Sequence, residues 1–190
     1  MDLQIIEETA DILDQLGEIP ISFEVRSLFR VDLEENGLGG IRLTEEPVDP
    51  PWLKDCDAEK EERPLTWRRW DLTNWGFISA MDDDLRAGCA VIATDTQDVN
   101  FLEDRKDLAA LWDIRVRPDY RGKGVGRALM TTVEEWSRKR GCIQLKIETQ
   151  NINVPACRFY AAMGAQLGMI NRFAYQDYPD EIELIWYKDL

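Results

Sequence analysis

The chain of 190 residues contains no histidine. This absence excludes Ser-His-Asp and Cys-His activation of a nucleophile, because both arrangements use an imidazole as the base. Acid–base chemistry must therefore come from carboxylates, tyrosine, lysine, cysteine or water. The four cysteines form no CxxC pair, and without histidine they do not make a typical zinc site, so no metal is expected. We expect free thiols at all four positions, Cys56, Cys89, Cys142 and Cys157.

Positive charge is also scarce. The chain has 23 lysines and arginines against 37 aspartates and glutamates, a formal net charge of −14. Nucleic acids and anionic membrane surfaces are bound through clustered Lys and Arg, so neither is expected as a partner. An acidic surface attracts a cationic substrate, but it also serves simply to keep a protein soluble, and composition does not separate these two readings.

Long hydrophobic runs are missing. No run approaches the roughly 20 apolar residues that a membrane-spanning helix needs. The N-terminal segment, with Glu7 and Glu8, lacks the basic start and apolar core of a signal peptide, so we expect a cytoplasmic protein. Hydrophobic residues make up 44% of the chain, which is enough for one well-packed core. The prediction is a single domain over 1–190.

The start of the chain carries two local patterns. Apolar positions among acids over 3–16 predict a short amphipathic helix. Alternation over 21–33 predicts a strand, which we expect to be the first strand of the sheet. The alternation slips between Val25 and Leu28, which indicates a bend or bulge at that point.

The stretch 34–69 is rich in glycine and proline and carries an acidic cluster over 55–62. This composition predicts an irregular excursion with limited helix, and loops of such length tend to be functional or disordered. Large apolar side chains indicate that part of it packs down, either as cover for the core or as a wall of an acceptor pocket. These residues are Trp52, Leu53, Trp67 and Trp70.

The rest of the chain alternates between strand and helix signals. A hairpin is expected over 74–94, with its turn at Met81 to Asp84, and a strand over 108–116. Glycine and proline punctuation then predicts a helix ending at Gly141, a strand over 142–149, a helix over 154–163, and strands near 165–175 and 181–187. This order predicts an α/β fold built on a mixed sheet with antiparallel pairs at both ends.

The most informative segment joins the strand 108–116 to the next helix. Three glycines in this turn let the backbone approach an anion closely, and the helix that follows presents its unpaired N–H groups. Two basic residues add positive charge within an acidic protein. The spacing matches neither a P-loop nor a dinucleotide fingerprint, and a glycine turn alone is often only a tight connection. The residues are Arg121, Gly122, Lys123, Gly124 and Gly126.

A second group of residues surrounds the helix 154–163. Asn153 is placed to cap its N-terminus, Pro155 suits its first turn, and Gly164 is placed to end it. Tyr160 lies on this helix and has two readings, an ordinary buried aromatic beside Phe159 or a functional phenol.

The order Arg121-x-x-Gly124-x-Gly126, preceded by Ile114-x-Val116, resembles motif A of the GNAT superfamily of N-acetyltransferases. The resemblance implies a GNAT acyl-CoA N-acyltransferase fold with a splayed, mostly antiparallel central sheet, and acetyl-CoA as cosubstrate. It implies that the turn amides hold the pyrophosphate of coenzyme A and that the strand bonds the pantetheine arm. The implied cofactor-binding residues are Ile114, Val116, Arg121, Gly122, Lys123, Gly124, Val125 and Gly126.

The helix 154–163 and its approach resemble motif B of the same superfamily. In that motif an asparagine before the helix contacts the cofactor arm and a tyrosine on the helix lies near the thioether sulfur. Carried over, Asn153 becomes a cofactor contact and Tyr160 the proton donor to the departing CoA thiolate. A phenol with a pKa of about 10 is a competent donor to a thiolate of comparable basicity.

Further segments resemble the streptothricin acetyltransferase branch: Glu148-Thr-Gln-Asn-x-Asn153, Asp113-Ile114, and Ile185-Trp186-Tyr187. This branch implies an amine acceptor on a small polycation, in streptothricin an amino group of the β-lysine moiety. The site must attract the ammonium and remove a proton, and carboxylates do both. Asp113 and Glu148 are the candidates for this role, with a strand-edge salt bridge or turn contact as the alternative for each.

Several alternatives stay open at this level. The acceptor can be another small amine, an aminoglycoside, a polyamine, or a protein lysine or N-terminus, and the chain can instead be a non-catalytic acetyl-CoA sensor. Direct transfer is expected, because neither Cys142 nor Cys157 has a histidine or a clear thiolate-stabilising partner. Relatives often form homodimers, but no segment here specifies an interface.

Overall fold

The computed structural model describes residues 3–58 and 63–190, so part of the predicted acidic cluster, residues 59–62, lies outside it. The chain divides into two compact units. The first comprises Met1–Ile21, Asp55–Ile147 and Tyr187–Leu190, and the second comprises Ser22–Lys54 and Glu148–Trp186. A single domain over 1–190 stays a prediction.

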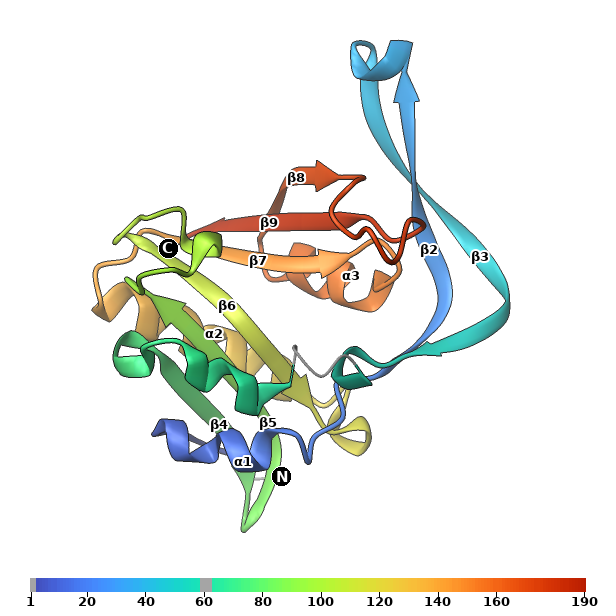
Figure 1. Cartoon of the computed structure of the whole chain (residues 1–190). Coiled ribbons are helices and arrows are strands. Elements are labelled where there is room, and N and C mark those ends of the chain that lie inside the picture. The colour runs from blue at the N-terminus through green and yellow to red at the C-terminus, as the bar shows by residue number, and fades with distance from the viewer. Residues whose placement is uncertain (1–2, 59–62) are drawn as a thin grey trace. The chain divides into compact units, whose positions relative to one another are not determined.

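The first unit is built on strands in the order β1-β4-β5-β6-β7, of which β4 to β7 can be followed in Figure 1. Neighbouring strands are antiparallel, except that β6 and β7 run parallel. The hairpin of β4 and β5 and the strand β6 confirm the expectations for 74–94 and 108–116. The bounds are β1 Leu3–Glu8, β4 Gly76–Asp82, β5 Leu85–Thr94, β6 Leu108–Val116 and β7 Gln144–Gln150.

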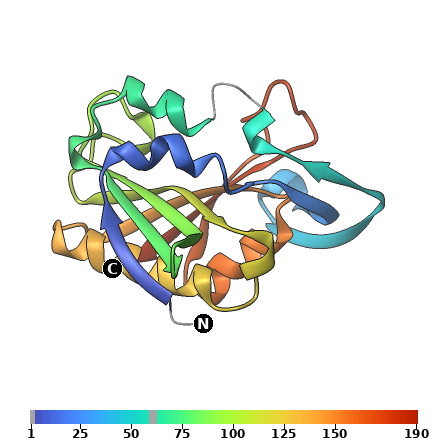
Figure 2. The same cartoon turned by 90° about the horizontal axis from the view of Figure 1, so that it is seen from below.

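Helices cover both faces of this sheet (Figure 2). On one face lies α2, Val125–Lys139, and it approaches so closely that a Cβ at Gly76 would lie 2.4 Å from the Trp136 ring. On the other face, α1, Leu13–Leu16, packs into a core with the 3-10 helices Ala10–Ile12 and Pro64–Arg69. Residues of β5 such as Val91 are completely buried between these layers.

The strand β6 carries a local irregularity at Trp112. Val91 of β5 is opposite Asp113, whereas Ile92 is opposite Leu111, so Trp112 is the extra residue of a bulge. The ladder between β6 and β7 covers Leu108–Leu111 and Gln144–Ile147 only. The two strands are therefore paired over only part of their length, as expected for a sheet in which these strands splay apart.

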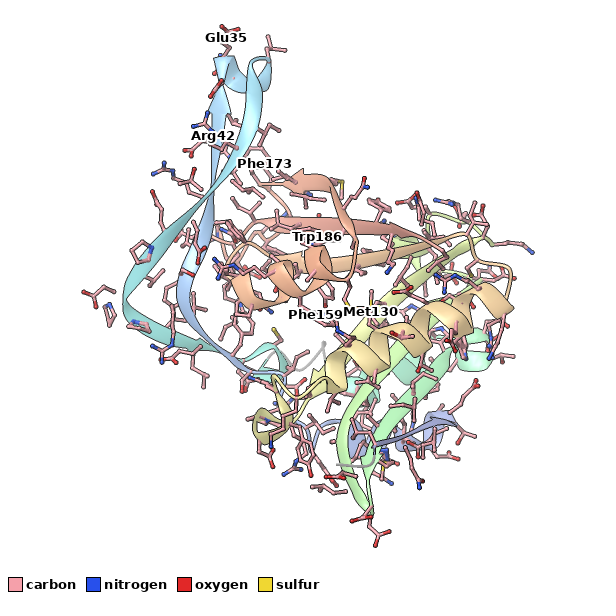
Figure 3. All side chains as sticks on the ribbon, turned by 180° about the vertical axis from the view of Figure 1, so that it is seen from behind. Glu35, Arg42, Met130, Phe159, Phe173 and Trp186 are labelled. Atoms are coloured by element: carbon pink, nitrogen blue, oxygen red, sulfur yellow. The ribbon has the colours of Figure 1, made fainter. Side chains whose placement is uncertain are left out.

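The second unit contains a long antiparallel ribbon of β2, Phe23–Glu34, and β3, Gly40–Lys54. Glu35 lies in the turn of this ribbon and Arg42 on the adjoining part of β3 (Figure 3). The predicted bulge is confirmed by a register shift between Val25 and Ser27. The other elements of the unit are α3 Val154–Ala162, β8 Gln166–Asn171 and β9 Glu183–Asp189, with β9 between β7 and β8.

Three predictions for the first 69 residues were wrong. Residues 3–8 form β1 rather than helix, because β4 offers them a full antiparallel ladder, and only 13–16 are α-helical. The expected first strand, β2, follows β1 and pairs outside the main sheet. Residues 40–54 form β3 rather than irregular chain. Prolines are tolerated there because an edge strand has outward N–H positions that need no partner.

The four large apolar residues noted in and just after 34–69 differ in burial. Trp67 is buried in the core of the first unit and Trp70 packs against it, which supports their reading as core cover. Trp52 and Leu53, at the end of β3, are exposed. No helix in the described ranges is both long and apolar enough to cross a membrane.

Candidate active site

The end of β6 presents two of the implied cofactor contacts. Ile114 is opposite Ala90 and Val116 is opposite Gly88 on β5, and both side chains are half-buried. Gly88 must be small, because a Cβ there would lie 2.7 Å from the Arg115 carbonyl oxygen. The close β5–β6 contact therefore fixes the backbone of the strand that enters the glycine turn.

The turn after β6 is shaped by left-handed glycines. Gly122 has φ +74° and Gly124 has φ +92°, and a Cβ at either position would meet no atom of the described residues within 4 Å. Gly124 caps α2 without any side-chain hydrogen bond, so the first N–H groups of this helix have no side-chain acceptor. We call the turn 121–126 the glycine cradle; it adjoins the positive end of α2, where backbone N–H groups favour a phosphate group.

Arg121 braces this turn from inside. Its Nε donates to the Val116 carbonyl oxygen at 3.1 Å, and its Nη2 donates to the Pro20 carbonyl oxygen at 3.4 Å. Lys123 is exposed, with its Nζ 5.3 Å from the centre of the Tyr120 ring. Both residues keep positive charge beside the cradle, which the pyrophosphate of coenzyme A would need.

The variant Gly124→Ala tests the cradle. Alanine pays about 1–2 kcal/mol in a left-handed conformation, so we expect lower stability and about tenfold weaker acetyl-CoA binding by calorimetry. Gly17→Ala is the matched control, because Gly17 has φ −64° and equally open surroundings. An unchanged acetyl-CoA affinity in Gly124→Ala would show that the turn does not hold the cofactor.

In the second unit, the cap of α3 is as the sequence predicts. The Asn153 side chain accepts a hydrogen bond from the Ala156 N–H at 3.2 Å. Tyr160 lies on the buried side of α3 and its ring is 5.5 Å from that of Phe159. Only 6% of the Tyr160 surface is exposed, so the residue is largely shielded from water. Such burial is compatible with the proton-donor role that the resemblance implies.

Glu148 differs sharply from Asp113 in its surroundings. Glu148 is exposed on β7, and its Oε1 accepts a hydrogen bond from the Tyr175 hydroxyl at 2.8 Å. Asp113 is buried on β6, and both of its carboxylate oxygens lie 3.0 Å from Arg115 Nε. This pairing favours the salt-bridge reading of Asp113 and leaves Glu148 as the accessible carboxylate.

Arg115 is the centre of a buried ion cluster in the first unit. Besides Asp113, it donates to Asp57 at 2.6 and 3.0 Å and to the Ile19 carbonyl oxygen at 3.3 Å. Burial opposes its charge, but the two aspartates outweigh burial and raise the pKa of the guanidinium. Arg115 therefore ties β6 to two segments on the α1 face of the sheet.

The cysteines are poor candidates for a covalent acyl carrier. Burial raises the pKa of the Cys157 thiol to about 12 and also raises that of Cys142. Both are therefore protonated and weakly nucleophilic at neutral pH. Their surroundings support transfer without an acyl-enzyme.

The predicted site residues fall into two groups. The first unit holds Asp113, Ile114, Val116 and the turn 121–126, and the second holds Glu148, Asn153 and Tyr160. Sequence reasoning missed Arg115, although it alternates with Asp113 on one face of β6. It also missed Tyr175, which has no local signature.

The strand β6 leads through a glycine turn into α2, as the resemblance to acetyl-CoA-dependent N-acetyltransferases implies. A family model described as Acetyltransferase (GNAT) family matches residues 41–165, and the chain belongs to this family. The family match and the full-length relatives confirm the resemblance and the GNAT fold.

Among individual proteins, the chain is similar to the streptothricin acetyltransferase of Escherichia coli, with 30% identity over 95% of this chain and 91% of the relative. The Streptomyces lavendulae streptothricin acetyltransferase is 29% identical over 89% of this chain and 84% of the relative. The crystal structure of a nourseothricin acetyltransferase has a TM-score of 0.76 at 27% identity, covering 100% of this chain and 99% of that chain. A Bacillus anthracis protein solved with acetyl coenzyme A gives the same TM-score, 0.76, at 26% identity, covering 100% and 98% of the two chains.

Proposed function

We propose that this enzyme acetylates an amino group of streptothricin, at the β-lysine moiety. The observation that carries the proposal is the similarity to streptothricin acetyltransferases along nearly the whole chain, not only through the cofactor motif. The formal charge of −14 suits a polycationic acceptor, because an acidic protein draws cations toward it.

The proposed cofactor contacts come from both motifs of the sequence. Acetyl-CoA supplies the acetyl group as a thioester. Backbone N–H groups of Gly122, Gly124, Val125 and Gly126 bind its pyrophosphate, with positive charge from the side chains of Arg121 and Lys123. Ile114 and Val116 bond the pantetheine arm through their backbone, and Asn153 contacts the same arm. The open cradle at Gly122 and Gly124 supports this assignment.

The proposed chemistry divides between a donor and an acceptor side. Tyr160 donates its phenolic proton to the leaving sulfur. Glu148 attracts the substrate ammonium and takes or relays its proton, because a protonated amine is no nucleophile. Asp113 is the weaker candidate on this side, because Arg115 holds both of its carboxylate oxygens.

We further propose that residues 1–190 act as one catalytic domain in the cytoplasm. The candidate residues are divided between the two units, and β7 and β9 both continue from one unit into the other. The family model covers residues 41–165, which include parts of both units. The four free cysteines suit a reducing compartment.

The proposal is tested by following CoA release with a thiol reagent. Streptothricin, two aminoglycosides, spermidine and a lysine peptide are compared at equal concentrations with acetyl-CoA. A kcat/KM at least tenfold higher on streptothricin, with mass spectrometry placing the acetyl group on β-lysine, is the expected result. A preference for another amine would overturn the acceptor, and acetyl-CoA binding without turnover would favour a sensor.

A further inference from the structure

Tyr175 lies between two side chains of β7 in the second unit. Its hydroxyl donates to Glu148 Oε1 at 2.8 Å, and the Tyr175 hydroxyl oxygen accepts a hydrogen bond from Gln150 Nε2 at 3.4 Å. Because Gln150 supplies a proton from one side, the phenolic hydrogen is directed to Glu148 on the other. Burial and then the charge of Glu148 raise the pKa of Tyr175, so it remains a donor at neutral pH.

The segment 172–182 that carries Tyr175 is held at several points. Its first residues are fixed by Asn171, whose Oδ1 accepts from the Phe173 N–H at 3.1 Å and whose Nδ2 donates to Glu183 at 3.3 Å. Farther along, Glu181 accepts a hydrogen bond from Lys54 at 2.6 Å in a pair that is mostly buried.

The last residue of the segment is fixed by a buried amide. Asn151 Oδ1 accepts from the Ile182 N–H at 2.8 Å, and Asn151 Nδ2 donates to the Phe29 carbonyl oxygen at 3.1 Å. Asn151 is only 2% exposed and immediately follows β7. The loop and the strand that bears Glu148 are therefore locked to each other, and Tyr175 is held in place rather than free to swing.

We propose that Tyr175 is the positioning residue for Glu148, and that the segment 172–182 thereby selects primary alkylammonium acceptors over guanidinium groups. This inference rests on the proposed role of Glu148 at the acceptor amine. A carboxylate offers about four lone-pair sites, and Tyr175 takes one of them on Oε1.

The selectivity follows from the shapes of the two cations. An ammonium is a compact charge that needs a single N–H···O contact to a carboxylate oxygen. A guanidinium binds best as a planar fork that places two parallel N–H groups on the two carboxylate oxygens together. With the phenol bound to Oε1, a fork that needs both oxygens must share Oε1 with Tyr175, whereas a monodentate ammonium can use Oε2 alone.

The decisive variant is Tyr175→Phe, which keeps the ring and removes the hydroxyl. We expect the KM for the amine to rise about tenfold, as for loss of one hydrogen bond to a charged group, with the KM for acetyl-CoA unchanged. Inhibition by argininamide should strengthen relative to lysinamide. Tyr187→Phe is the matched control, because the Tyr187 hydroxyl also faces a carboxylate, Glu103 at 3.5 Å, on the first unit.

Equal rises in both KM values, or an unchanged ratio of the two inhibitors, would overturn the proposal and indicate a merely structural tyrosine. If the wild-type enzyme acetylates no amine, the proposed function is wrong, but the role of Tyr175 can still be tested. Binding of lysinamide and argininamide is then measured by calorimetry in the presence of acetyl-CoA. Weaker lysinamide binding in Tyr175→Phe supports the positioning role, and identical binding overturns it.

Discussion

Replacing Tyr160 with phenylalanine is expected to lower kcat by about 10²–10⁴-fold while acetyl-CoA binds nearly as well. The phenol is the proposed proton donor to the leaving sulfur, and without it the thiolate departs unprotonated or takes its proton from water. Tyr160 lies on the buried stripe of α3 with Val154 and Cys157, and phenylalanine fills the same space there. Rates come from the thiol assay and cofactor affinity from calorimetry.

The control for this prediction separates catalysis from folding. Cys157→Ala alters the same stripe without touching a phenol, so it should lower stability by about 1–3 kcal/mol and leave kcat within about twofold. Thermal unfolding of both variants checks the fold. If Tyr160→Phe kept a kcat within about threefold of wild type, another group would have to be the proton donor.

Elements with strong local signals were predicted almost to the residue. The turn into α2 and the cap and end of α3 depend on Gly124, Asn153 and Gly164, whose conformational roles are local. Strand β6 was also predicted with its observed bounds, Leu108–Val116. Elements that depend on a distant partner were missed. The apolar pattern of 3–8 is compatible with either a helix or a strand, and only the pairing with β4 decides for the strand.

The site shows the same division. The sequence predicted the glycine cradle, Asn153 and the two carboxylates as candidates, because each belongs to a contiguous motif. It could not tell Asp113 from Glu148, since their partners are far along the chain. Arg115 pairs with Asp57, which is 58 residues away in the sequence, and Glu148 is hydrogen-bonded to Tyr175, which is 27 residues away. Side-chain partners at such separations follow from the fold, not from spacing.

The second large effect is expected at the buried ion cluster. Arg115→Met should lower the free energy of unfolding by about 3–5 kcal/mol, because it leaves the carboxylate of Asp113 buried without a partner. The Arg115 side chain is only 1% exposed and that of Asp113 3%. The matched control is Arg105→Met: its pair with Asp107 is 33% and 46% exposed and should contribute at most about 1 kcal/mol.

The pH dependence identifies the cause of this loss. Burial raises the pKa of Asp113, and Arg115 opposes that rise, so removing Arg115 raises the pKa further. The folded variant then binds a proton that the unfolded chain, with a pKa of about 3.9, binds only at lower pH. The loss of unfolding free energy relative to wild type is therefore full above the pKa of Asp113 in the folded variant, and it shrinks as pH falls through that pKa.

Urea unfolding between pH 5 and 8 measures this trend. The double variant Arg115→Met with Asp113→Asn should recover most of the lost free energy of unfolding at all pH values. A deficit that grows as pH falls, or no recovery in the double variant, would show that lost packing rather than the stranded charge destabilises the fold.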